Sequence, residues 1–273
     1  WNDDYDLSKF PCVVDSPHAS LGTGVGLAFC TGRLSFFANT SGPSIGLDTA
    51  CSSGLIALSL GRSHLLDAQC ESAYCAGTNL ILSVYSHSKI CNMNALSHDG
   101  RCKTLDASAD GYGRAEGVAS CVLTTSLRKS GPDTLMDVGV NQDARSSSLV
   151  APRGSAQESL IRNVTSAYST CGQFTAYGMH GTGTELGDPI ETSALLRALA
   201  TTGRWAPSIL SSKSIRGHSE GTSGLAGFLS SLECLNVREN AACFASLRNL
   251  NPHALRAHAS IRAGFPRAVS ANI

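Results

Sequence analysis

The chain has 273 residues, of which 42% are apolar and 15% are charged, and its formal net charge is zero. This length allows one large domain or two small ones, and the composition argues against a disordered chain. A neutral chain also lacks the broad positive field with which proteins attract nucleic acid or an anionic membrane surface.

Apolar segments in the first half alternate with polar, glycine-rich stretches. Leu27–Phe37 is apolar enough for a short helix or a buried segment. Ser52–Leu66 has apolar residues on most sides of a helix, which is typical of a buried helix. Three short runs predict strands, the last two of them buried: Ser44–Leu47, Ser72–Gly77 and Val118–Leu123.

Helix starts are clearer in the second half. Ser155 and Glu158 have the spacing of a capping box, and Asp188–Glu191 repeats the pattern with Pro189 at the first helical position. Strands are predicted over Phe174–Met179 and Ser208–Ser211, and a further helix over Leu225–Leu232. This alternation predicts a layered α/β fold, with a boundary near residues 126–134.

Eleven cysteines are scattered along the chain without a C-x-x-C pair. An odd, scattered set is not typical of a disulfide framework or a zinc site, so we expect no metal centre and a soluble protein in a reducing, intracellular setting. No apolar stretch reaches the roughly 18 residues of a membrane span. No signal peptide is visible, although the chain begins at Trp1.

Cys51 lies in the most informative segment, SIGLDTACSSGLIAL, where a strand candidate leads into the long apolar helix. The thiol is therefore predicted at a turn near a helix N-terminus, where backbone N–H groups and the helix dipole stabilise a thiolate. Small neighbouring residues leave room for a substrate carbonyl. The pattern favours a nucleophile, and the alternative is a buried structural cysteine.

A nucleophilic cysteine needs a histidine nearby in space. Of the eight histidines, His180 and His218 each follow a strand candidate, where α/β folds gather functional side chains. Lys213 precedes His218 closely and could hold a carboxylate or a charged substrate. The alternative for each histidine is a hydrogen-bonded structural side chain.

Four motifs, in this order, give the chain a resemblance to the β-ketoacyl synthases, the condensing enzymes of fatty-acid and polyketide assembly in the thiolase superfamily. They are Asp48-Thr49-Ala50-Cys51-Ser52-Ser53, Val140-Asn141-Gln142-Asp143 with Ala151-Pro152, His180-Gly181-Thr182-Gly183-Thr184 continuing to Glu191, and Lys213-Ser214 with Gly217-His218-Ser219-Glu220. A stretch containing Asp106, Arg114 and Glu116-Gly117 also matches. The residues of the histidine and cysteine motifs resemble those of the polyketide and multifunctional type most.

The resemblance implies a thiolase-like, layered α-β-α-β-α fold that is represented in part. Residues 1–130 would be the remainder of the N-terminal half, which carries the nucleophile, and residues 131–273 a truncated C-terminal half, which carries both histidine motifs. The family is longer at both ends, and its Gly-Phe-Gly-Gly-Thr-Asn-Ala-His segment has no counterpart here. Ile215-Arg216 and Gly54 stand where the family usually has Asn-Ile and Ser.

The resemblance also implies an acyltransferase that condenses acyl groups. Cys51 would take an acyl group from a carrier-protein thioester. His180 and His218 would hold the carbonyl of a malonyl thioester while carbon dioxide leaves, and the resulting enolate would attack the Cys51 thioester. Two imidazoles suit this step because their N–H groups meet the charge that develops on the oxygen.

The remaining site residues implied by the resemblance are Lys213, which would fix the second histidine region through a carboxylate, and Thr182 and Thr184, which would bind the pantetheine arm. The phosphopantetheine belongs to the acyl carrier protein, and no other cofactor is implied. A homodimer through the strand before Cys51, or a larger assembly, is expected. Two alternatives stay open: a non-catalytic synthase-like subunit, and thiolase chemistry on coenzyme A, which the two histidines disfavour.

Overall fold

The computed structural model describes residues 23, 24, 26–125, 133–166, 176–200, 207–237 and 244–260. The chain divides into two compact units. Unit 1 comprises residues 1–96, 114–132 and 218–226, and unit 2 comprises residues 97–113, 133–217 and 227–273. Most of the boundary predicted near residues 126–134 lies outside the described residues. No helix in the described ranges is both long and apolar enough to cross a membrane.

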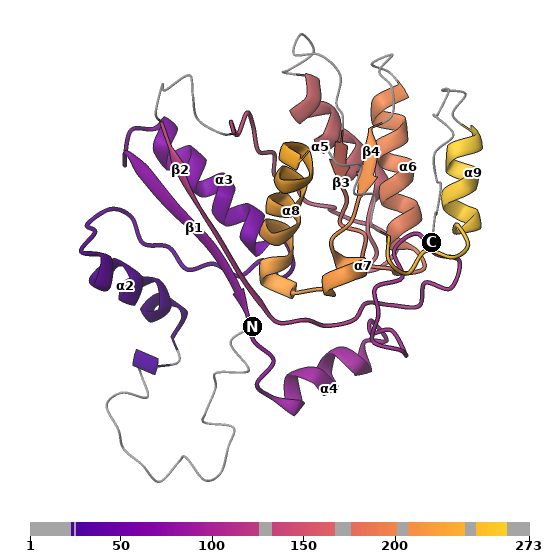
Figure 1. Cartoon of the computed structure of the whole chain (residues 1–273), viewed down its shortest axis with the longest axis horizontal. Helices are drawn as coiled ribbons and strands as arrows, with labels where there is room; N and C mark the ends of the chain where they lie inside the picture. The colour runs from indigo at the N-terminus through magenta and orange to yellow at the C-terminus, as the bar shows by residue number, and fades with distance from the viewer. Residues whose placement is uncertain are drawn as a thin grey trace. The chain divides into compact units, whose positions relative to one another are not determined.

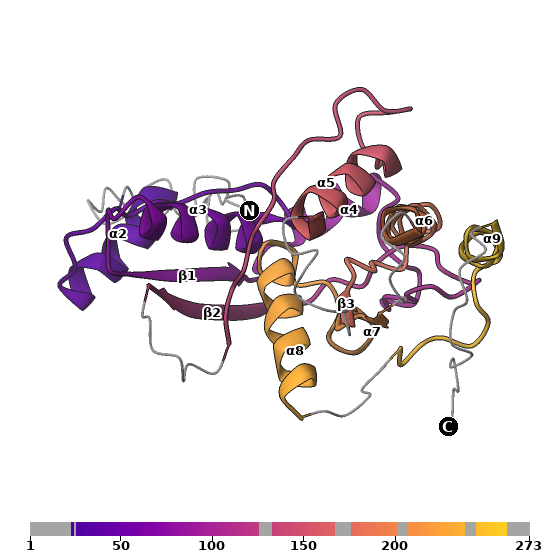
Figure 2. The same ribbon diagram turned by 90° about the horizontal axis from the view of Figure 1, so that it is seen from above.

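Unit 1 is built on an antiparallel strand pair. β1 (Ser72–Asn79) pairs with β2 (Gly117–Thr124) along their whole length. Helix α3 (Ser53–Leu66) lies along this pair, as Figures 1 and 2 show. The close approach depends on Gly61, where a β-carbon would lie 2.5 Å from the Cys75 sulfur. The other elements of unit 1 are α2 (Leu27–Ala38), α4 (Val84–Asn92), the short 3₁₀ helix η3 (Glu220–Thr222) and the start of α8 (Ser223–Val237).

The two strands of unit 1 confirm the predicted positions but not the predicted burial. Leu58 of α3 and Cys75 of β1 are buried, whereas Tyr74, Val118 and Val122 on the strands are 59–71% exposed. Side chains alternate between the two faces of a strand, and α3 covers only one of them. Helix α2 forms as predicted, but no residue in it is buried.

The strand predicted over Ser44–Leu47 is wrong. Among the described residues this segment joins no ladder, and the nearest pairing is an isolated bridge between Thr49 and Cys51. A strand needs a partner for its backbone groups, and β1 and β2 here pair with each other as a two-stranded sheet.

Unit 2 carries a short parallel strand pair and most of the helices. β3 (Ala176–Gly178) pairs with β4 (Ser208–Leu210), so both carboxyl ends lie at the same edge. The helices are α5 (Gly154–Ser166), α6 (Gly187–Ala200), α7 (Lys213–Arg216), the larger part of α8 and α9 (Pro252–Ser260) (Figure 1). Buried leucines and alanines line α6, and α6 packs against α5 and α9.

The capping box predicted at the start of α5 does not form. The helix begins at Gly154, the Ser155 hydroxyl accepts a hydrogen bond from the Arg153 side chain, and Glu158 forms ion pairs with two arginines. Guanidinium groups compete successfully for these oxygens because charge-assisted hydrogen bonds are stronger than those to a neutral backbone N–H.

Candidate active site

Cys51 lies on a tight turn immediately before α3. Ala50 has a φ of 55°, in the left-handed region that residues other than glycine seldom adopt. The turn is held by Ser53, whose hydroxyl accepts from Thr49 N at 2.9 Å and donates to Ala50 O at 2.7 Å. Asp48 accepts the Ala50 N–H at 2.9 Å, and this hydrogen bond lowers the pKa of the carboxyl. Strain at such a position is typical of functional sites.

The start of α8 packs closely against this turn. A β-carbon on Gly54 would lie 2.9 Å from Leu225 Cβ, and one on Gly224 would lie 2.9 Å from Leu55 Cγ. The Ser223 hydroxyl reaches Cys51 O at 3.4 Å. Small residues therefore bring η3 and α8, which follow His218, up to the cysteine turn within unit 1.

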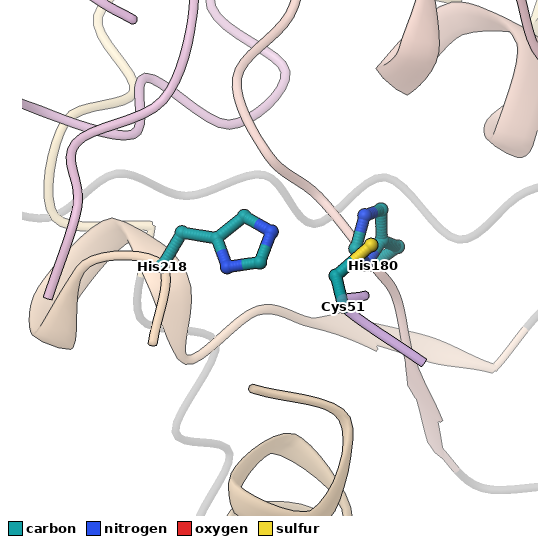
Figure 3. A group of neighbouring side chains, drawn as sticks. All are labelled: Cys51, His180 and His218. Carbon is teal, nitrogen blue, oxygen red and sulfur yellow. The ribbon is translucent and has the colours of Figure 1, made fainter. Parts of the chain in front are cut away.

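His218 is 3% exposed, and one of its ring nitrogens lies within 4.8 Å of the Cys51 sulfur (Figure 3). Its Nδ1 accepts the Glu220 N–H at 2.9 Å. A neutral imidazole carries one proton, so an Nδ1 that accepts leaves the proton on Nε2. The backbone thus fixes the tautomer in which Nε2 is a hydrogen-bond donor.

A buried ion pair holds the Glu220 end of this loop. Arg114 donates to both carboxylate oxygens of Glu220, at 2.6 and 3.0 Å, and the two side chains are 3% and 1% exposed. Glu220 has a φ of 43°, and Ala115 N donates to His218 O at 2.9 Å. The ion pair therefore anchors the residue whose N–H orients the His218 ring.

His180 lies in unit 2, two residues after β3, and is exposed. The N–H groups of His180 and Gly181 donate to the two carboxylate oxygens of Glu191, at 2.6 and 3.0 Å. Gly181 and Gly183 have φ values of 50° and 76°, so the loop needs glycine at both positions. The carboxylate of Glu191 holds the backbone that carries His180.

Lys213 lies at the start of α7, just past the end of β4, and is 3% exposed. Burial raises the pKa of Glu191, while the two backbone N–H groups and the charge of Lys213 act to lower it. Burial likewise raises the pKa of Asp188 to about 6, again with Lys213 acting in the opposite direction. Lys213 therefore supplies positive charge to the carboxylates that hold the His180 loop.

The two threonines of the first histidine motif lie close together in the same loop. Thr182 Oγ1 and Thr184 Oγ1 are 3.2 Å apart, and Thr184 Oγ1 accepts the Gly187 N–H at 3.2 Å. Thr104, which is buried, donates to Gly181 O at 2.6 Å. The loop is thus fixed from both sides within unit 2.

The sequence interpretation missed the roles of three carboxylates. Asp188 and Glu191 were expected to cap α6, but the helix begins at Gly187, and the carboxylates instead bind the N–H groups of Leu105 and Gly183 and those of the His180 loop. Glu220 was noted only as part of a motif. The signal for these roles was a charged residue within an apolar segment, because such a residue is rarely buried without a partner.

Two family models cover most of the chain. Residues 13–128 match the β-ketoacyl synthase N-terminal domain, and residues 134–243 match the β-ketoacyl synthase C-terminal domain. The chain therefore belongs to the β-ketoacyl synthase family, and its relatives place it with the polyketide synthase type.

Among curated relatives, the highly reducing polyketide synthase calA of Penicillium decumbens is 35% identical, over 98% of this chain and 10% of that protein. The polyketide synthase component of lovastatin nonaketide synthase from Aspergillus terreus is 39% identical, over 76% of this chain and 7% of that protein. The chain spans about a tenth of the length of the curated relatives it matches.

Solved ketosynthases have the same fold. The ketosynthase from module 6 of the Bacillus subtilis 168 bacillaene synthase superposes with a TM-score of 0.76 at 32% identity, covering 84% of this chain and 42% of that one. The oxazolomycin ketosynthase domain from Streptomyces albus JA3453 gives a TM-score of 0.75 at 32% identity, covering 84% and 41%. The thiolase-like fold expected from the motifs is thereby confirmed, in partial form.

Proposed function

We propose that this chain is the ketosynthase portion of a polyketide synthase and catalyses decarboxylative Claisen condensation. The observation that carries the proposal is the Cys51 thiol within 4.8 Å of the His218 ring, in a chain of this family. Cys51 is the nucleophile, and His180 and His218 are the two imidazoles that meet the developing negative charge.

The reaction has two stages. The Cys51 thiolate attacks the carbonyl of an acyl thioester on a carrier protein and expels the carrier thiol, which leaves the acyl group on the cysteine. A malonyl thioester then loses carbon dioxide, and the electron pair of the broken C–C bond forms an enolate. The enolate carbon attacks the acyl-cysteine carbonyl and expels the Cys51 thiolate, which leaves a β-ketoacyl chain on the carrier.

His218 suits the decarboxylation step because it presents a donor. Its Nδ1 accepts from the Glu220 backbone, so Nε2–H is the ring donor that would meet the thioester oxygen as that oxygen becomes negative. An oriented donor in a buried setting stabilises such charge without reorganisation. We assign His180 the matching role from its place in the first histidine motif.

The other site residues have supporting roles in this proposal. Lys213 acts as a positioning residue, through the carboxylates it faces. Thr182 and Thr184 hydrogen-bond the pantetheine arm, which the acyl carrier protein domain brings with it. In sequence, the N-terminal half comprises residues 1–130 and the C-terminal half residues 131–273. The protein acts as a homodimer or within a larger assembly. We propose a reducing, intracellular setting, because eleven scattered cysteines without a C-x-x-C pair are not typical of a disulfide framework.

Release of carbon dioxide from malonyl carrier protein tests this function. Cys51→Ala is expected to abolish condensation while leaving decarboxylation measurable, because the carbon–carbon bond breaks before the cysteine is attacked. His218→Gln is expected to slow decarboxylation about 10²–10³-fold, the usual effect of losing one oxyanion donor. His64→Gln is a matched control, because His64 lies on α3 and its described side-chain hydrogen bond is to Gln69, in the turn after that helix.

A folded wild-type chain that releases no carbon dioxide would support the non-catalytic alternative, which the relatives do not favour. Unchanged decarboxylation in His218→Gln would remove His218 from the mechanism. Turnover of acetoacetyl-coenzyme A in place of the malonyl thioester would point to thiolase chemistry.

A further inference from the structure

Two cysteines of unit 1 face each other across its strand pair. Cys75 in β1 and Cys121 in β2 are direct partners in the antiparallel register of the two strands, which lie side by side in Figures 1 and 2. Among the residues that the structure describes, no other two cysteines are partners in a strand ladder. Neither cysteine belongs to the four motifs, and neither has a part in the proposed condensation.

The register gives these two residues the spacing of a disulfide. Directly opposed residues of an antiparallel pair have Cα atoms about 4.5–5.5 Å apart, and disulfides span Cα distances of about 4.4–6.8 Å. Register partners point to the same face of a sheet, so both thiols lie on the face that α3 covers. The two thiols are hydrogen-bonded to each other. The strands therefore already hold the two side chains as a disulfide requires.

The two thiols differ in exposure and in acidity. Cys75 is 3% exposed, donates to Ala57 O at 3.4 Å and lies against Gly61 of α3. The hydrogen bond with Cys121, together with burial, raises the pKa of the Cys75 thiol. The same hydrogen bond lowers the pKa of Cys121, which is half-buried, to about 7. Cys121 is therefore the thiol that ionises and meets a reagent from solvent, and Cys75 is a protonated thiol held beside it.

We infer that Cys121 and Cys75 form a redox site that reacts with hydroperoxides and closes as a disulfide between β1 and β2. An accessible thiolate next to a second, resolving cysteine is the arrangement in which oxidation by a peroxide is reversible. Cys121 is the cysteine that is oxidised first, and Cys75 is the resolving cysteine. The inference does not rest on the proposed function, because neither thiol has a part in it.

The chemistry needs a hydroperoxide as its only oxidant. The Cys121 thiolate attacks one peroxide oxygen, the O–O bond breaks, and a sulfenic acid forms while the other oxygen leaves as hydroxide or alkoxide. The Cys75 sulfur then attacks the sulfenic sulfur, and its proton leaves with the hydroxyl group as water. The two thiols thus give two electrons to the peroxide. A thiol reductant reverses the step, as it does for the transient disulfides of reducing compartments.

The test follows the disulfide itself in the whole 273-residue chain. Cys51→Ala is the parent protein, because the proposed nucleophile would otherwise consume peroxide, and it retains ten of the eleven cysteines. A small excess of hydrogen peroxide should lower the number of titratable thiols from ten to eight, and dithiothreitol should restore all ten. These counts follow from one intramolecular disulfide per chain.

Peptide mapping identifies the linked cysteines. Trypsin combined with a glutamate-specific protease cleaves after Glu71, which separates Cys70 from Cys75, and after Glu116. We expect residues 72–89 to be linked to residues 117–128 in the oxidised parent, and the link to disappear after reduction. A link from Cys70 to Cys75 would overturn the inference; Cys70 is the natural competitor, because it acts on the pKa of the Cys75 thiol.

Variants of the parent separate the two roles. Cys75→Ser keeps a donor for Ala57 O but cannot form the link, so the sulfenic acid on Cys121 should persist and be trapped by dimedone. Cys121→Ser should give neither the link nor the dimedone adduct at that position. Cys234→Ser, which changes a half-buried cysteine of α8, is the matched control and should behave as the parent does. Circular dichroism checks that each variant is folded.

Three further results would contradict the redox site. These are an unchanged thiol count in the parent, oxidation of Cys121 and Cys234 at equal rates, and equal dimedone labelling of Cys121 in the parent and in Cys75→Ser. Release of carbon dioxide is measured separately. A chain that forms the disulfide but is inactive on malonyl thioesters would refute the proposed function alone, and an active chain without the disulfide would refute this inference alone.

Discussion

Removal of Arg114 should lower the free energy of unfolding of the chain by a large fraction. Arg114→Ala would leave the Glu220 carboxylate, 1% exposed, without its bidentate partner. Breaking a buried pair by deleting one member costs about 3–5 kcal/mol, since the remaining charge has lost both water and its counter-ion. Domains are stable by about 5–15 kcal/mol, so the urea midpoint should fall markedly.

Urea unfolding followed by circular dichroism measures this cost, and Arg114→Ala, Glu220→Gln and the double variant that combines them form a double-mutant cycle. The double variant should be more stable than Arg114→Ala, because no buried charge remains. Arg162→Ala, which removes a more exposed pair with Glu158, should cost under about 1 kcal/mol. A loss below 1 kcal/mol for Arg114→Ala, or strictly additive effects in the cycle, would refute the reasoning.

Three further predictions follow from the described contacts. Iodoacetamide should label Cys51 ahead of the other ten cysteines. Cys121 should be second, because its hydrogen bond with Cys75 lowers the pKa of the Cys121 thiol to about 7. Peptide mass spectrometry measures the labelling rates, and equally slow labelling of all cysteines would contradict this prediction. Burial raises the pKa of Asp188 from 3.8 to about 6, so the folded chain holds this proton more tightly, and wild type should lose about 2 kcal/mol of stability relative to Asp188→Asn as pH rises from 4 to 6. Parallel pH–stability curves for the two proteins would be the contrary result. Gly77→Ala should cost about 1–3 kcal/mol, because its β-carbon would lie 3.1 Å from Thr222 Cα; a thermal unfolding midpoint equal to that of wild type would show that the backbone yields freely.

Some elements could be predicted from local sequence patterns. Where such a prediction is wrong, the cause is also local. The apolar spacing in α3 and α8 located both helices, because a helix that buries one face must repeat apolar residues at its own period. Ser44–Leu47 has the composition of a strand but no pairing partner among the described residues. The pattern of a capping box at Ser155 was present, but an arginine side chain took the hydroxyl.

The residues of the candidate site were identified from motifs alone, and the sequence correctly predicted that Cys51 lies just before the N-terminus of α3. Only the tertiary structure decided which contacts hold these site residues in place. Arg114 and Glu220 are 106 residues apart, and nothing near either one specifies the other as its partner. The same holds for Leu105 and Asp188, 83 residues apart. A helix period is written within a few turns of chain, whereas a buried charge finds its counter-charge only after distant segments have packed and excluded water.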